Sequence, residues 1–135
     1  MRLVIYKAFF ALTLLCGTSA ISFAKYLCAI NEVYECVAVT GCTRASVKNA
    51  NLAGVMVLDI QKKQLSMAPL GGVPRTDDID SLTVSDDAIL LYGTGKRKAD
   101  RTFSAVISLK SGNLSAGLST LDSSFSMLGT CSSAP

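Results

Sequence analysis

Apolar and small polar side chains alternate between residues 102 and 119, and this pattern decides the fold class. Two apolar series flank the polar segment Lys110–Asn113: Phe103, Ala105, Ile107 and Leu109 before it, and Leu114, Ala116 and Leu118 after it. A period of two places the apolar side chains on one face of an extended strand. One apolar face is typical of antiparallel sheets that cover a core. The segment therefore predicts a β-hairpin.

Two further hairpins are expected earlier in the chain. Residues 56–69 alternate in the same way on both sides of a polar turn at 61–64. Residues 82–92 contain two short apolar runs separated by Ser85–Asp87. Polar, turn-forming residues between alternating runs are typical boundaries of neighbouring strands.

The remaining segments add further short strands. Tyr26–Val39 predicts one or two strands interrupted at Asn31–Glu32, and Phe125–Cys131 predicts a last strand. Thr43–Ala53 has no clear period and predicts a loop or one short helix. We therefore expect a mainly β fold, a small antiparallel meander that closes into a barrel or sandwich and covers its strand edges. A closed or nearly closed barrel is favoured.

The first 24 residues have the pattern of a secretory signal peptide. Arg2 and Lys7 flank a positive region, a short apolar run follows, and small residues occupy the third and first positions before Lys25. This spacing fits the A-x-A cleavage rule, with Thr18–Ala20 as a second candidate site. The apolar run is far shorter than the roughly 20 residues that span a bilayer. We expect residues 1–24 to be removed.

Residues 25–135 are then expected to form a single disulfide-stabilised domain in the periplasm or outside the cell, with no membrane span. Two of the 13 basic residues lie in the signal peptide, which leaves 11 basic residues against 10 acidic ones. This balance lacks the strongly basic surface of a nucleic-acid binder. No nucleic-acid partner is expected.

Four cysteines remain after removal of the signal peptide: Cys28, Cys36, Cys42 and Cys131. An even number in an exported chain predicts two disulfides. Three of the cysteines lie near the start of the domain and one near its end, so every pairing ties the two ends together. The pairing that we favour is Cys28 with Cys36, closing a local hairpin, and Cys42 with Cys131.

Catalytic and metal-binding patterns are absent from the sequence. The chain has no histidine, and histidine is the commonest general base and metal ligand. The cysteine spacing contains no C-x2-C pair of the kind that binds zinc. Gly93–Lys98 resembles a phosphate loop but lacks its first glycine and its final Ser or Thr. We expect a protein that is not an enzyme and that has no metal or cofactor.

Five aspartates lie close together in the middle of the chain: Asp77, Asp78, Asp80, Asp86 and Asp87. Paired carboxylates could act as acid and base or bind calcium through oxygen. Aspartate beside Ser, Thr and Gly is, however, ordinary turn chemistry. We interpret the group as solvated turns.

A basic group between two predicted strands is the candidate partner-binding loop. It consists of Lys96, Arg97, Lys98 and Arg101. Such a charged loop can steer binding to an anionic partner, although the same composition also suits a solubilising loop. No aromatic residue is interleaved to stack on bases.

In outline, the domain resembles the periplasmic lysozyme-inhibitor barrels of bacteria. The resemblance consists of export, about 110 residues, antiparallel hairpins and cysteines that tie the ends together. The S-G-x-x-Y segment of those inhibitors has no counterpart, because Ser111-Gly112 is followed by Asn113, Leu114 and Ser115. The chain is therefore not assigned to that family.

Two functional hypotheses follow from these features. The first is an exported, non-enzymatic binding module of the cell envelope, whose partner is an envelope protein, lipid or glycan. The alternative is a proteinaceous inhibitor of a secreted hydrolase such as lysozyme, which would act by inserting the basic loop Lys96–Arg101 into an acidic cleft.

Overall fold

The computed structural model describes residues 25–68, 72–95 and 101–134. The expected signal peptide, 1–24, and the loop residues Lys96, Arg97 and Lys98 lie outside these ranges. The described residues form ten strands and no helix, and so none that could cross a membrane. The strands are β1 (Lys25–Val37), β2 (Gly41–Ala45), β3 (Val55–Asp59), β4 (Gln64–Met67), β5 (Arg75–Asp78), β6 (Ser81–Val84), β7 (Ala88–Thr94), β8 (Thr102–Ser108), β9 (Asn113–Ser119) and β10 (Ser123–Ala134).

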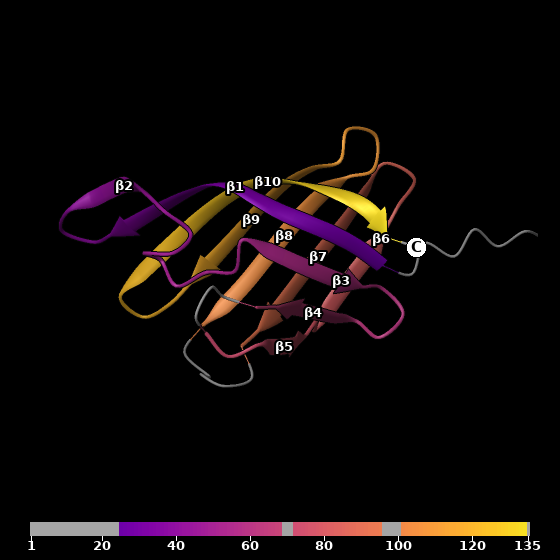
Figure 1. The fold of residues 1–135 in the computed structure, drawn as a ribbon, viewed down its shortest axis with the longest axis horizontal. Coiled ribbons are helices and arrows are strands. Elements are labelled where there is room, and N and C mark those ends of the chain that lie inside the picture. The colour runs from indigo at the N-terminus through magenta and orange to yellow at the C-terminus, as the bar shows by residue number, and fades with distance from the viewer. Residues whose placement is uncertain (1–24, 69–71, 96–100, 135) are drawn as a thin grey trace, which may run out of the picture.

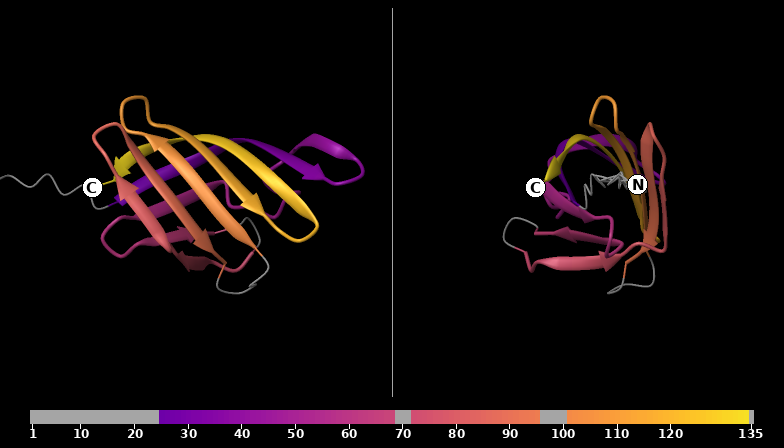
Figure 2. Two further views of the ribbon diagram at one scale, coloured as in Figure 1. Left: turned by 180° about the vertical axis from the view of Figure 1, so that it is seen from behind. Right: turned by 90° about the vertical axis from the view of Figure 1, so that its right-hand side faces the viewer.

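The strands form one antiparallel sheet that curls into a half-barrel (Figures 1 and 2). Their order is β5-β4-β3-β1-β10-β9-β8-β7-β6, with β2 paired to β1 beside this path. The mainly β prediction is therefore confirmed, with one difference in topology. Two meanders, β3–β5 and β6–β10, are joined through β1, which lies between β3 and β10 and also pairs with β2.

The two ends of the sheet meet at a corner between β5 and β6. The amide of Ile79 donates to the carbonyl of Lys63 beside β4, at 2.8 Å, and the amide of Asp80 donates to the carbonyl of Tyr92 on β7, at 2.9 Å. One short bend thus hydrogen-bonds to strands from both halves of the sheet. Because buried backbone groups need partners, these two bonds hold the curled sheet together at this corner.

The expected hairpins are confirmed, and their apolar faces point inward. Phe103, Ile107 and Leu114 of the β8–β9 hairpin are buried, and Met56 and Leu58 of the β3–β4 hairpin are buried in the same core. Gly112 in the β8–β9 turn has a φ of 73°, a backbone conformation that glycine adopts without steric cost. The alternation seen in the sequence is therefore the alternation between core and solvent.

Strand β1 is a single strand of 13 residues with an irregularity where the sequence predicted an interruption. Its pairing with β10 shifts register between Ile30 and Glu32, which leaves Asn31 as the extra residue of a bulge. On the opposite edge, the first half of β1 pairs with β3 and the second half with β2. The bulge thus separates a part of β1 within the half-barrel from a part that extends beyond it.

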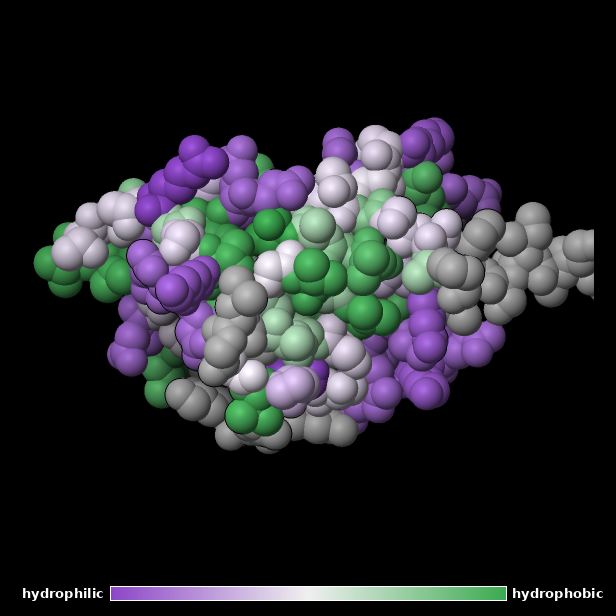
Figure 3. All heavy atoms as spheres, in the orientation of Figure 1, coloured by the Kyte–Doolittle hydropathy of each residue, from purple (hydrophilic) through white to green (hydrophobic). Residues whose placement is uncertain are grey.

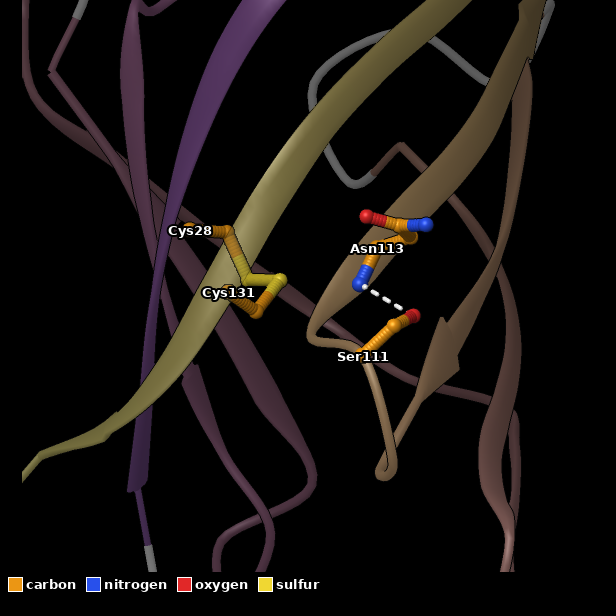
Figure 4. Close-up of a disulfide and its surroundings, with 4 residues drawn as sticks. All are labelled: Cys28, Ser111, Asn113 and Cys131. Carbon is orange, nitrogen blue, oxygen red and sulfur yellow. Dashed lines mark hydrogen bonds between the residues drawn. A yellow bond between two sulfur atoms is a disulfide. The ribbon is translucent and has the colours of Figure 1, made fainter.

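Both disulfides join directly opposite residues on neighbouring strands. Cys28 of β1 bonds Cys131 of β10 (Figure 4). Cys36 of β1 bonds Cys42 of β2. The prediction that a bridge ties the two ends of the domain is confirmed, but the favoured pairing of Cys28 with Cys36 is wrong. These two cysteines lie on one continuous strand, about 25 Å apart at ~3.3 Å per residue, and disulfides need Cα atoms within about 7 Å.

The sequence analysis missed two strands. Residues 41–45 form β2, and turns follow as far as Asn51, so the segment expected to be a loop or short helix is part strand and part turn. Residues 75–78 form β5, although they were interpreted as part of a solvated turn region. Both strands are short and mostly polar, so hydrophobic alternation does not mark them.

Candidate functional site

The interior of the half-barrel contains a narrow apolar cavity of about 50 Å³. Its walls come from β3 and β4 in one half of the curled sheet and from β8, β9 and β10 in the other half. They include Met56, Leu58, Leu65, Phe103, Leu114 and Met127. Apolar walls with few polar groups are typical of small-molecule sites.

Strand β5 brings two charged side chains to this cavity. Arg75 and Asp77 alternate with Thr76 and Asp78, and it is Arg75 and Asp77 that line the cavity. The Nε atom of Arg75 lies 3.8 Å from Oδ2 of Asp77, and the side chains are 16% and 5% exposed. Desolvating two charges is expensive and contributes little net stability. A charged pair in an otherwise apolar interior therefore points to a functional role.

The burial of Asp77 corrects the interpretation of all five aspartates as solvated turns. Asp77 is 3% exposed and is the one charged residue in the core of the described chain. Asp78 accepts a hydrogen bond from the Gln64 side chain at 3.2 Å. Asp80 accepts hydrogen bonds from the backbone amide and hydroxyl of Thr94 at 2.9 and 3.1 Å. These carboxylates each have a structural contact of their own.

The two remaining aspartates lie at the turn between β6 and β7. Asp86 and Asp87 are both exposed, and Asp87 forms an ion pair with Lys110 at 2.8 Å. They fit the solvated turn that the sequence predicted. Within the described residues, no group of three or more acidic or cysteine side chains is placed to hold a metal ion.

Arg101 lies where the cavity meets the outside. An outer hollow of about 230 Å³ shares Leu52, Arg75, Arg101 and Leu118 with the cavity. These four residues therefore line the boundary between the two spaces, which is called the aperture below. The aperture lies at the end of the half-barrel where β9 turns into β10, since Thr120, Leu121 and Asp122 line the outer hollow.

Gly95 explains how Arg101 reaches this position. The amide of Gly95 donates to the carbonyl of Arg101 at 3.2 Å. A Cβ atom at position 95 would collide with the Arg101 side chain, so that side chain lies across Gly95. Of the candidate loop Lys96, Arg97, Lys98 and Arg101, the structure describes Arg101 alone, and it places this residue at the aperture.

A second exposed feature is the β1–β2 hairpin, which projects from the half-barrel (Figure 1). Its tip carries Val39, which is 95% exposed, and the Cys36–Cys42 bond closes the hairpin just behind the tip. Near its base, the Tyr34 hydroxyl donates a hydrogen bond to the Glu32 carboxylate at 2.9 Å. This hydrogen bond and the charge of Glu32 raise the pKa of Tyr34 above its ordinary value of 10.0.

The outer face of β3 carries apolar side chains as well. Figure 3 shows apolar residues gathered around β3 on the face seen in Figure 1. Leu27 and Val57 are paired across β1 and β3, and Val55 lies two residues along from Val57. Leu27 and Val55 are about half exposed. Contiguous apolar residues on a surface are typical of contact sites.

The sequence singles out Arg101 as a candidate binding residue, but it led to Asp77 being interpreted as part of a solvated turn and gave no indication of Arg75. Both faces of β5 are polar, so no apolar series shows which of its side chains point inward. The signal that was available is Ile79, an apolar residue in the same alternating series as Arg75 and Asp77. That series becomes meaningful only when the segment is known to be a strand.

Comparisons with known proteins add no assignment. No protein-family model matches the chain, and no curated protein or solved structure is significantly similar to it.

Proposed function

We propose that this protein is an exported, non-enzymatic binding module of the cell envelope that holds a small apolar ligand inside its half-barrel. The observation that carries this proposal is the apolar cavity, which Arg75 and Arg101 border on the side of the outer hollow. Apolar walls remove an apolar ligand from water, and polar groups at one end fix its orientation.

The two disulfides support the cellular location in this proposal. They are consistent with an oxidising compartment outside the cytosol, because thiols in the cytosol are kept reduced. The sequence pattern of residues 1–24 favours the same location. We propose that this compartment is the periplasm or the extracellular medium.

Native mass spectrometry of the protein isolated gently from its own host tests the proposal. We expect a small-molecule adduct that is released on denaturation. The matched variants are Ala116→Leu, which fills the cavity, and Ser115→Leu, which adds the same side chain on the exposed face of β9. Loss of the adduct in Ala116→Leu alone supports binding inside the half-barrel. An adduct that survives in Ala116→Leu places the ligand elsewhere.

An inhibitor of a secreted hydrolase such as lysozyme is the second candidate, and the projecting β1–β2 hairpin favours it. A hairpin closed by a disulfide presents Val39 with little loss of conformational entropy on binding. In this proposal the hairpin is a second contact with the hydrolase, in addition to the basic residues Lys96, Arg97, Lys98 and Arg101. Inhibition of a panel of secreted hydrolases should then fall when the four basic residues become Ser or when Val39 becomes Asp. If both variants inhibit the hydrolase as strongly as the parent protein does, neither the basic residues nor Val39 takes part in inhibition.

A further inference from the structure

We infer that the ligand is a single unbranched acyl chain with an anionic head group, held with its chain in the cavity and its head group against Arg101 and Arg75. This inference rests on the proposed function and names the chemical class of its ligand. It follows from the size of the cavity, the chemistry of its walls and the charges at its aperture.

The size of the cavity restricts the ligand to a thin molecule. A single water needs roughly 10–15 Å³ when volume is measured in this way, so a cavity of about 50 Å³ holds only a few waters. A fused-ring or branched ligand would need the packed walls to move apart, which is costly in a close-packed interior. An unbranched methylene chain is only one carbon wide along its length, so it fits a narrow apolar space.

The walls of the cavity select for hydrocarbon. Leu58 of β3 and its cross-strand partner Leu65 of β4 line the cavity together with Leu114 of β9, and all three side chains are buried. Each methylene group transferred from water to such surroundings strengthens binding about fourfold. A polar chain such as an oligosaccharide would instead lose its hydrogen bonds to water there without replacement.

The charges favour an anion at the aperture. Arg75 and Arg101 both line the aperture, whereas Asp77 lies deeper and is engaged by Arg75. Among the described residues, Arg101 forms no ion pair. Because Arg75 is engaged with Asp77, Arg101 is the guanidinium group at this boundary that is left for an anionic group of the ligand. Guanidinium groups bind carboxylate and phosphate oxygens through paired, charge-assisted hydrogen bonds.

The outer hollow provides the space for a head group. It has about 230 Å³ and contacts the same two arginines from the solvent side. Its rim includes Thr120, whose hydroxyl is already engaged with Ser123, and the carboxylate of Asp122. A head group with one or two negative charges therefore meets Arg101 first, and the acyl chain passes inward beside Leu52 and Leu118.

Titration calorimetry of the full secreted chain, stripped of bound ligand by solvent extraction, tests the inference. The probes are pentanoate, pentanol, pentylamine and acetate, because a cavity that holds only a few waters also holds only a few methylene groups. We expect pentanoate to bind at least tenfold more tightly than pentanol, since hydrogen bonds to charged groups exceed neutral ones. Acetate should not bind measurably, because it lacks the chain. Vesicles of an anionic phospholipid form a separate arm, in which extraction of an acyl lipid would identify a membrane source and not a free fatty acid.

Three variants locate the head group. Arg101→Gln should weaken pentanoate binding about tenfold or more and change pentanol binding less than twofold. Arg101→Lys should retain most of the affinity and also shows that position 101 tolerates substitution, with circular dichroism confirming the fold. Lys110→Gln is the control, because Lys110 pairs with Asp87 away from the aperture.

The outcomes separate this inference from the proposed function. Equal affinity for pentanoate and pentanol, unchanged by Arg101→Gln but abolished by Ala116→Leu, overturns the anionic head group and retains an apolar ligand. Tightest binding of pentylamine would overturn the inference in favour of a cation at Asp77. If no chain-bearing probe binds and the isolated protein carries no adduct, both the inference and the proposed function fail.

Discussion

Replacing Cys28 and Cys131 together by Ala is expected to destabilise the domain far more than replacing Cys36 and Cys42 by Ala. The first disulfide closes a loop with a sequence separation of 103, and the second a loop with a separation of 6. A disulfide restricts the unfolded chain, and the entropy removed grows with the logarithm of loop length. The chain-entropy relation gives about 4.7 kcal/mol for the long loop and about 2.2 kcal/mol for the short one.

The burial of the two bridges adds to this contrast. Cys28 is buried and lines the cavity, so its replacement also removes packing in the core. Cys36 and Cys42 lie in the projecting hairpin, where Cys42 is exposed and no core depends on it. The full difference between the two double variants should therefore be at least about 2.5 kcal/mol.

Urea unfolding followed by circular dichroism measures this difference, since the chain has no tryptophan to report by fluorescence. With an m-value of about 1.2 kcal/mol per M, the unfolding midpoint of the Cys28/Cys131 variant should lie roughly 2 M below that of the Cys36/Cys42 variant. Prepared as residues 25–135, which exclude Cys16, both variants lack free thiols, so disulfide exchange does not complicate the comparison. Equal midpoints, or a lower midpoint for the Cys36/Cys42 variant, would refute the loop-length reasoning.

Three further substitutions test the packing and the hairpin. Leu58→Ala should lower the unfolding free energy by about 2.7–5 kcal/mol, because Leu58 is 0% exposed. Val55→Ala, on the outer face of the same strand, should lower it by less than about 1 kcal/mol in the same urea assay. Gly129→Ala should lower the thermal midpoint, because the added Cβ would collide with a backbone carbonyl of β1; an unchanged midpoint would show that the bulge gives way. Glu32→Gln should lower the pKa of Tyr34 toward 10.0, as seen in its ultraviolet titration. Since the raised pKa of Tyr34 favours its neutral form in the folded state, its small contribution to stability is present below pH 10 and is lost as the pH rises through the folded pKa.

Local patterns in the sequence were sufficient to predict most of the individual strands. The β8–β9 and β6–β7 hairpins follow from alternation and turn residues that lie within about ten positions of one another. The interruption expected at Asn31–Glu32 is the bulge of β1 for the same reason, since two polar residues break an apolar series. These features depend on neighbouring side chains, and the sequence displays neighbours directly.

The candidate site could be predicted only in part. Arg101 was recognised because basic residues cluster around it in the sequence. Arg75 and Asp77 were not recognised, because a polar strand has no apolar series to show which face turns inward. Their burial depends on pairing with β4, where Asp77 lies opposite Leu65 in the core.

The sequence by itself determined that the domain is made of antiparallel strands and that its four cysteines can form two disulfides, at least one of which ties the two ends of the domain together. The tertiary structure decided which cysteines bond, where β1 lies in the sheet and which charges enter the interior. The physical reason is that pairing between distant strands depends on register and on which faces meet. Cys28 reaches Cys131 only because β1 and β10 are neighbours in the curled sheet.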